Sequence, residues 1–592
     1  MKKESILYFI AALPALAFSD ASNTTAPVGC RKLSTDHDWP AAEVWEAAIP
    51  GVIRQNGSDI HGSLPNYRVR AKKTSDVQAA VRFASKHNIR LSVITTGHDQ
   101  LGRSDAASGL VIDLSLMNKV TVLQSFSPTN NGAVNPHYPI DAPNKITPRE
   151  GVQAAVTFHP GVTGLALNYA VAPSGLFTTS GAAAGVAVAG GWGQNGGYGP
   201  LTAQYGLGVD QWLEAKIVTA DGQLRVANNV SHQDLFWAIR GGGGGTFGIV
   251  VEATWKAHVA VPITGYNWYI NSTITGPDAL DPETGRTPLS DAMQYLLGEL
   301  PGLQELGISA FVYVDISYVR CYAVHPGNAS GISKANAAWG PILAKMQSFP
   351  NIKPFQTKPY NFDNYKDFFV TTYGPLAETT SNMQPRNHGI FPYDSRLMAP
   401  EHLRNPGIMD ALGGAEGTYG LLMTAPGQSQ GTGEDTSANP GWRRAVVHLV
   451  AAPNADGLRK LAPDMGAYIN EASLREDNWT QSFWGVNYPR LSAIKSKYDP
   501  GMLFWTTPGI NAHYMQAING RACLILPPPL SPPAIPPASD RAAPADPVTD
   551  AQFLFGSLEL IGVKFPAPGT YIGLQTEPSV DGDQVRSVKT SN

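Results

Sequence analysis

The chain has 592 residues, of which 43% are hydrophobic and 15% are charged, as in ordinary globular proteins. This length exceeds what one hydrophobic core usually organises, so we expect two or more substructures. The formal net charge is −4. A chain without a basic surplus lacks the cations that neutralise a phosphate backbone, which counts against a nucleic-acid partner.

Residues 1–19 have the pattern of a secretory signal. Two lysines precede an apolar run from Ile6 to Phe18, and small residues suited to a signal peptidase follow. This run is shorter than the roughly 20 residues that span a bilayer. We therefore predict a cleaved signal peptide and a secreted protein with no membrane partner; the alternative is a short membrane anchor.

The segment from Pro65 to Ala257 alternates between helical and strand periodicity, which predicts an α+β domain. Helices are expected at 74–88, 163–171 and 231–239, strands at 90–95, 109–114, 152–158 and 246–255, and a hairpin between 214–220 and 223–227. Asp221-Gly222 is the turn signal of that hairpin.

The rest of the chain is less regular. Residues 258–465 contain strand-like runs at 308–319 and 444–451, and residues 487–491 lead into a helix. Nine prolines fall between Pro527 and Pro547, so we expect an extended, solvated tail from 526 to 592. The chain has three cysteines, Cys30, Cys321 and Cys523. A Cys30–Cys523 disulfide would join the two ends of the globular region, and this pairing is left open.

Three glycine-rich segments need a chemical explanation. The first, TTGHDQLGRS at 95–104, follows a predicted strand, and its glycines can turn several backbone N–H groups toward a pyrophosphate. The second, at 181–199, has small residues that let the main chain lie flat against a planar ligand; the alternative is tight packing between chain segments. The third, at 241–248, contains G-x-G-x-x-G but precedes a strand, which argues against a Rossmann fold.

Four motifs in this order carry a resemblance to a known family. They are TTGHDQLGRS, AVAGGWGQNGGYGPLTAQYGLGVD, DLFWAIRGGGGGTFGIV and FWGVNYPRLSAIKSKYDPGMLF. Together they resemble the berberine bridge enzyme-like oxidases of the vanillyl-alcohol oxidase (VAO) superfamily, in particular the fungal isoamyl alcohol oxidase-like branch. The resemblance runs from about Cys30 to Cys523.

This resemblance implies an α+β fold. It comprises a p-cresol methylhydroxylase (PCMH)-type FAD-binding domain of two α+β subdomains, and a substrate domain with an antiparallel sheet covered by helices. The implied boundaries are a signal peptide at 1–19, an N-terminal segment at 20–60, the FAD domain at 61–257, the substrate domain at 258–465, a berberine-bridge-type segment at 466–525 that returns to the FAD domain, and the tail at 526–592.

The resemblance also implies covalent FAD. The family's attached histidine aligns with His98, which would carry a single 8α-histidyl link; relatives with a second, cysteinyl link have a cysteine where this chain has Ala183. The residues expected to hold the pyrophosphate are Thr96, Gly97, Asp99, Gly102, Arg103 and Ser104. Those expected to border the flavin are Gly190, Gly191, Gly196, Gly197 and Tyr198, with Gly248, Ile249 and Val250 beside the adenosine half.

Oxidation of an alcohol needs a base near the hydroxyl while the C–H delivers hydride to the flavin. GAYINE at 466–471 resembles the family's Y-x-N segment, so Tyr468 is the expected base, presented on a strand, with Asn470 or Glu471 as its partner. Tyr488 is the second candidate. For both tyrosines the alternative is an aromatic side chain packed in the core.

No metal is expected, since His137, His159, His232 and His258 show no paired ligand spacing. The G-x-S-x-G match at 427–431 lacks the strand and helix of a nucleophile elbow, so we interpret it as a polar loop.

The expected activity is oxidation of an alcohol or a specialised metabolite, with O2 as the acceptor and release of H2O2. The small-molecule substrate is not identified, and we expect a monomer. Three other functions remain open: an oxidative cyclase or desaturase, a carbohydrate oxidase, and a secreted flavin-binding protein without turnover. A wall-associated protein with glycine tracts is a further alternative outside the flavoproteins.

Overall fold

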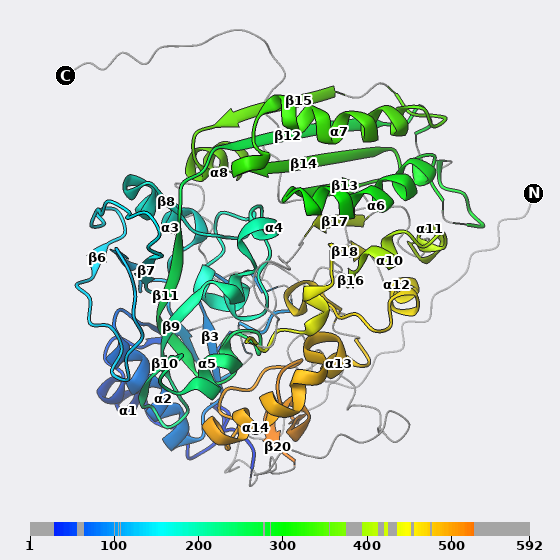
Figure 1. The fold of residues 1–592 in the computed structure, drawn as a ribbon. Helices are drawn as coiled ribbons and strands as arrows, with labels where there is room; N and C mark the ends of the chain where they lie inside the picture. Colours follow the sequence, from blue (N-terminus) through cyan, green and yellow to red (C-terminus); the bar gives the residue numbers. More distant parts are fainter. Residues whose placement is uncertain are drawn as a thin grey trace, which may run out of the picture. The chain divides into compact units, whose positions relative to one another are not determined.

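The computed structural model describes residues 29–55, 64–99, 101–104, 106, 108–275, 279–284, 286–353, 356–373, 394–412, 419–423, 435–451, 455–473 and 476–525. The predicted signal peptide, the Pro-rich tail and the G-x-S-x-G sequence therefore lie outside the described residues. The α+β fold class is confirmed, with helices packed on three main sheets. Figure 1 shows their arrangement.

The first sheet has four strands in the order β1-β2-β4-β3. The strands are Ile53–Arg54, Tyr67–Arg70, Leu110–Asp113 and Leu91–Ile94. Helix α2, Thr74–His87, packs on this sheet through the apolar positions that the sequence spacing predicts, Val77, Ala80, Val81 and Ala84. It ends at Asn88, whose φ of 56° is the left-handed conformation common at helix C-termini. Helix α1, Ala42–Ala48, adds Trp45, which stacks on Tyr67 with ring centres 4.0 Å apart.

The second sheet has the order β10-β9-β11-β7-β5-β6, with β8 paired to β11. Its strands are β5 Lys119–Leu123, β6 Tyr138–Pro139, β7 Ala154–Phe158, β8 Leu176–Phe177, β9 Trp212–Val218, β10 Leu224–Asn228 and β11 Ile249–Val259. The predicted hairpin is confirmed as β9 and β10, joined through Asp221-Gly222. An apolar core covers one face of this sheet. Its helices are α3 Gly164–Val171, α5 Gln233–Ile239, α13 Trp479–Trp484 and α14 Tyr488–Tyr498.

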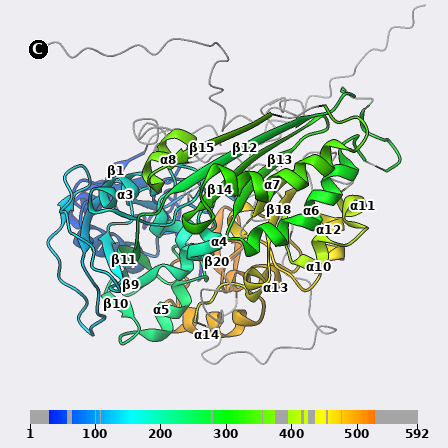
Figure 2. The same ribbon diagram turned by 45° about the horizontal axis from the view of Figure 1, so that its top comes forward.

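The third sheet is entirely antiparallel and has the order β15-β12-β14-β13-β17-β18-β16. Its strands are β12 Ile263–Asn271, β13 Ser309–Val314, β14 Tyr318–Pro326, β15 Gln356–Phe362, β16 Asp394–Met398, β17 Tyr419–Met423 and β18 Val447–Ala451. The single strand-like run expected at 308–319 is thus the start of a hairpin, because β13 ends at Val314 and β14 begins at Tyr318. Helices α6, Ser290–Glu305, and α7, Ile332–Gln347, run along one face of this sheet (Figure 2).

The remaining elements are short. They are α4 Thr202–Tyr205, α8 Tyr365–Tyr373, α10 Pro400–Leu403, α11 Ile408–Leu412, α12 Asp456–Leu461, β19 Met515–Ile518 and β20 Arg521–Leu524, together with several 3-10 turns. Strand β20 runs beside the first described residues, where Cys30 and Cys523 form a disulfide and Arg521 pairs with Asp36. The third cysteine, Cys321, is buried beneath α6 and α7. Among the described residues there is no helix long and apolar enough to span a membrane.

Candidate active site

The first glycine-rich segment is a compact turn at the end of β3. Gly97 and Gly102 have φ of 75° and 71°, a conformation that residues with a side chain rarely adopt. Between them Asp99 accepts hydrogen bonds from the backbone N–H and the guanidinium of Arg103. His98 is half-buried in this turn. The Asp99–Arg103 pair therefore restrains the conformation of this turn.

The second glycine-rich segment lies against this turn. Thr96 Oγ1 accepts a hydrogen bond from the Ala187 N–H. A Cβ added to Gly190 would lie 2.8 Å from Thr95 Oγ1, so a side chain at this position would have to displace Thr95. The third segment joins the same place, because a Cβ on Gly244 would lie 3.1 Å from Gly191 Cα. The structure thus brings together three segments that the sequence singled out separately.

Asn470 links these segments to the substrate side. Its Oδ1 accepts hydrogen bonds from Arg103 Nη2 and Asn195 Nδ2, both at 2.9 Å. Its Nδ2 donates to the Gly191 carbonyl at 3.1 Å and to Tyr468 Oη at 2.7 Å. All four hydrogen-bonding positions of the amide are used, so its orientation is fixed.

Glu471, the next residue, belongs to a neighbouring cluster. Its Oε2 accepts a hydrogen bond from Tyr198 Oη at 2.6 Å and lies 3.4 Å from His448 Nδ1, without hydrogen-bond geometry to that atom. Tyr198, His448 and Tyr468 lie within 5.5–5.7 Å of one another by ring centres. Trp442 completes this aromatic box, 5.3 Å from Tyr468. The Glu471 side chain keeps about a third of its surface exposed, at 31%, so among these groups it offers a carboxylate to an incoming ligand.

Burial sets the protonation of the two tyrosines in this box. It raises the pKa of Tyr468 well above its ordinary value, and the nearby Glu471 adds to the effect, while the hydrogen bond from Asn470 opposes it. Burial and the same carboxylate also raise the pKa of Tyr198. Both phenols therefore keep their protons at neutral pH. Tyr468 has an extended backbone but lies outside any strand, directly before a 3-10 helix at Ile469–Glu471, so the expectation that a strand presents it is wrong.

Two groups of predicted residues lie elsewhere. Tyr488 begins α14, where it packs against Trp479 and Trp484 and accepts a hydrogen bond from the Asn511 N–H, as a core contact would. Gly248-Ile249-Val250 leads into β11. The Ile249 and Val250 side chains pack into apolar cores, so only the backbone of this stretch remains to border a ligand.

Three residues of the site escaped the sequence analysis. Asn195 lies within the second glycine-rich segment. Its side-chain amide could have marked it as a candidate there, because the surrounding glycines have no side-chain hydrogen-bonding groups. Trp442 and His448 come from a stretch, 435–451, in which no motif marks them. His448 reaches the box through the pairing of β18 within the third sheet, and Trp442 lies in the 3-10 helix Pro440–Arg443 that precedes this strand.

Comparisons with known proteins agree with this geometry. Residues 65–228 match the family model described as an FAD binding domain, and residues 467–511 match the model described as berberine and berberine like. The chain is 28% identical to a VAO-type flavoprotein oxidase, VAO615, of Thermothelomyces thermophilus over 492 residues, covering 78% of this chain and 79% of the relative. The chain is an FAD-linked oxidoreductase of the VAO and berberine bridge enzyme family.

Solved structures show the same fold. The VAO-type flavoprotein MtVAO713 of Myceliophthora thermophila superposes with a TM-score of 0.72 at 23% identity, over 84% of this chain and 100% of that one. A glucooligosaccharide oxidase of Acremonium strictum superposes with a TM-score of 0.56 at 18% identity, over 77% and 94% of the two chains. That oxidase has a 6-S-cysteinyl, 8α-N1-histidyl FAD.

The residues of this FAD-linked oxidoreductase fit the cofactor. Ser104 Oγ and Asn195 Oδ1 are buried, and no described residue hydrogen-bonds either atom. Buried polar atoms without a partner usually belong to a ligand site or to bound water. Gly243 and Gly245, with φ of 108° and 68°, add turns whose N–H groups can face an anion. The turn at 95–104 would hold the pyrophosphate, and the backbone around Gly190 and Gly191 would border the ring system.

Proposed function

We propose that the chain is a secreted oxidase of an alcohol or a specialised metabolite, with its FAD attached to His98. The observation that carries this proposal is Asn470, which joins Arg103 of the predicted phosphate loop to the phenol of Tyr468. One amide thus fixes the position of a proton-bearing side chain relative to the cofactor loop. When bound, FAD supplies the hydride acceptor and returns its electrons to O2 as H2O2.

The proton of the substrate hydroxyl needs an acceptor, and Glu471 suits this role better than Tyr468. The phenol of Tyr468 keeps its proton, because burial raises its pKa. Glu471 is an acceptor-only carboxylate when ionised, and it is partly exposed beside that phenol. We propose that Tyr468 donates a hydrogen bond that orients the substrate oxygen, and that Glu471 Oε takes the proton. Tyr198 then holds the carboxylate in place.

The positions of the cysteines support a single flavin link. Cys30 and Cys523 are used in the disulfide, and Cys321 is buried on the helix-covered side of the third sheet. These are the three cysteines of the whole chain, so none is left beside Ala183 for a cysteinyl link. His98 would be the single attachment. The disulfide also supports secretion, since such bonds persist in oxidising compartments.

The test begins with an absorbance spectrum of the purified protein, repeated on the pellet after acid precipitation. Yellow colour in the pellet that is lost in His98→Ala and kept in His232→Asn would support the link. His232 is an exposed histidine at the start of α5, and asparagine tolerates its positive φ. Colour that passes to the supernatant in the wild type would contradict the role of His98.

The second step is a screen of primary, secondary and benzylic alcohols for peroxide release. Glu471→Gln should lower kcat/KM on any active alcohol by about 100-fold or more, within the range for loss of a general base. Tyr468→Phe should cost less and act mainly on KM. Equal activity of Glu471→Gln and wild type would remove Glu471 from the proton path. Reduction of an artificial acceptor without peroxide would identify a dehydrogenase.

A further inference from the structure

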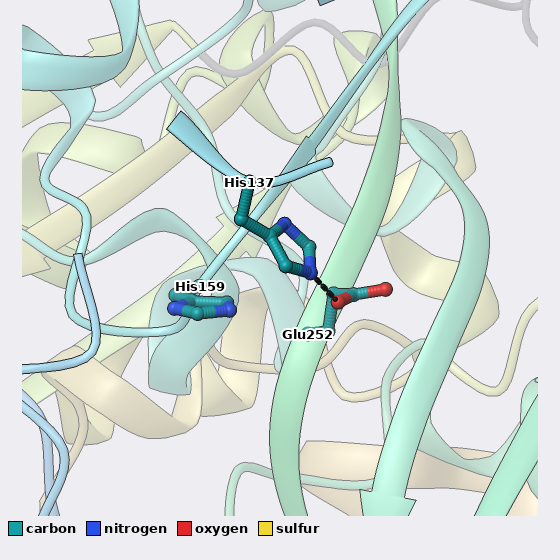
Figure 3. Close-up of side chains that lie close together, drawn as sticks. All are labelled: His137, His159 and Glu252. Carbon is teal, nitrogen blue, oxygen red and sulfur yellow. Dashed lines mark ion pairs between the residues drawn. The ribbon is translucent and has the colours of Figure 1, made fainter. Parts of the chain in front are cut away.

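Three side chains from distant parts of the chain meet on the second sheet (Figure 3), and none of them belongs to the candidate active site. His137 directly precedes β6, His159 follows β7, and Glu252 lies on β11. His137 Nε2 lies 2.9 Å from Glu252 Oε2, and the two imidazole rings have centres 4.9 Å apart. Among the described residues, this is the group of His, Cys, Asp and Glu side chains whose ligand atoms all lie within 4.8 Å of one another.

A bulge in β11 gives Glu252 its direction. The pairing with β9 shifts between Val250 and Glu252, so that two residues of β11 oppose one residue of β9. After the bulge, Ala253 points into the apolar core that also holds Ala189 of the second glycine-rich segment. Because side chains alternate along a strand, Glu252 points to the opposite face. His159 follows Phe158 of the same core and also turns to that opposite face. The cluster thus lies on the face of the second sheet opposite to that core.

The chemistry of the three groups is that of a metal site. Two imidazole nitrogens and one carboxylate oxygen, with room for a water, form a common ligand set for Zn²⁺. The Nδ1 atoms of both histidines are buried, and no described residue hydrogen-bonds them. We propose that His137, His159 and Glu252 bind one Zn²⁺ ion, with water as the fourth ligand.

Lys216 sets the strength of this site. Its Nζ pairs with Glu252 Oε1 at 2.7 Å and donates to the Ala133 carbonyl at 2.9 Å. It therefore occupies Oε1, and Oε2, which lies beside His137 Nε2, is the oxygen that faces the proposed metal site. The ammonium also repels a cation bound a few ångströms away. The site should accordingly bind Zn²⁺ more weakly than a closed site without a lysine would.

The bound ion would fasten one segment of the chain to the sheet. His137 belongs to the long connection between β5 and β7, while His159 and Glu252 belong to the sheet itself. A metal that bridges them stabilises the folded state, because it binds the folded chain and not the unfolded one. This role is structural and is separate from the flavin chemistry.

The test uses tag-free, full-length protein stripped of metal with a chelator and titrated with ZnCl2 in a calorimeter. We expect one ion per chain and a higher Tm with Zn²⁺. His137→Gln and His159→Gln should weaken binding by about tenfold or more, while His232→Asn should leave it unchanged. A stoichiometry of zero, or equal affinity of wild type and His159→Gln, would overturn the proposal.

Lys216→Met provides a measurement that does not depend on deleting a ligand. Removal of the ammonium should tighten Zn²⁺ binding by about tenfold, since at about 4 Å a unit charge at a protein surface interacts by well over 1.4 kcal/mol before screening. Unchanged or weaker binding in a folded Lys216→Met protein contradicts the site. Far-ultraviolet circular dichroism establishes that each variant is folded, so a loss of binding is not mistaken for a loss of structure.

Discussion

Lys495 of α14 is an ammonium group with no exposed surface. Its Nζ donates to the Thr246 carbonyl at 2.7 Å, to Asp499 Oδ2 at 2.6 Å and to the Phe504 carbonyl at 2.7 Å. All three of its donors are therefore used. The contact with Thr246 ties the berberine-like segment to the third glycine-rich segment. We expect Lys495→Met to test how much this buried pair stabilises the fold.

The expected loss is large because the substitution leaves a charge behind. Asp499 is also fully buried, and its remaining partners are the N–H groups of Leu503 and Phe504. Removing one partner of a buried ion pair typically destabilises a protein by about 3–5 kcal/mol, since the other charge stays desolvated. The free energy of unfolding of Lys495→Met should fall by that amount.

Lys497→Met is the matched control two residues later on the same helix. Lys497 pairs with Asp234 at the same 2.6 Å, but its side chain is 60% exposed. An exposed pair contributes about 0–1 kcal/mol, so this variant should unfold close to wild type. Urea-induced unfolding, followed by circular dichroism, measures both variants. Equal midpoints for Lys495→Met and Lys497→Met would refute the assignment of the difference to burial.

Two further predictions concern the site and the acid stability. Asn470→Asp turns the donor that faces the Gly191 carbonyl and Tyr468 into an acceptor. Loss of these hydrogen bonds should cost about 1–3 kcal/mol, which corresponds to a roughly 10- to 100-fold lower kcat/KM in the peroxide assay. The colour of the acid-precipitated pellet should stay unchanged. A wild-type kcat/KM for Asn470→Asp would show that the hydrogen bonds of the amide do not contribute to catalysis. Burial lowers the pKa of His325 from 6.5 to about 4, so the unfolded chain binds more protons in this range and stability is lost as pH falls from 6.5 to 4. His325→Gln keeps an acceptor for Trp339 Nε1 and should reduce the loss of unfolding free energy between pH 7 and pH 4 by about 3 kcal/mol. Unfolding midpoints at pH 7 and pH 4 measure this difference, and midpoints that match wild type at both pH values would contradict the prediction.

Local pattern was enough to predict much of the FAD domain. The i, i+3, i+4, i+7 spacing of α2, its end at Asn88 and the Asp-Gly turn of the β9–β10 hairpin are each decided within about ten residues. Residues 487–491 were expected to lead into a helix, and this helix is α14, which begins at Tyr488. The cofactor was predicted from the resemblance of the four ordered motifs to a known family, and an FAD binding domain is confirmed.

The connections between distant residues could not be predicted. Arg103 and Asn470 are 367 positions apart, and only the folded chain shows that one amide joins them. Glu252 faces the histidines because of a one-residue bulge, which reverses the side that strand alternation alone would give. His448 could not be predicted because Tyr198, Tyr468 and Glu471, which it meets in the box, come from other segments. Such sites depend on register and tertiary pairing, and a single sequence leaves both unspecified.

The first and last described segments lie side by side and are joined by backbone hydrogen bonds and a disulfide. The Leu524 N–H donates to the Gly29 carbonyl, the Arg31 N–H donates to the Ala522 carbonyl, and the disulfide lies between them. A described region whose two ends touch is nearly a closed ring, and such folds tolerate circular permutation. This oxidoreductase is thus suited to being cut open in an exposed loop and rejoined near Cys30 and Cys523, which would let an engineer relocate the points of attachment for a surface or a redox partner.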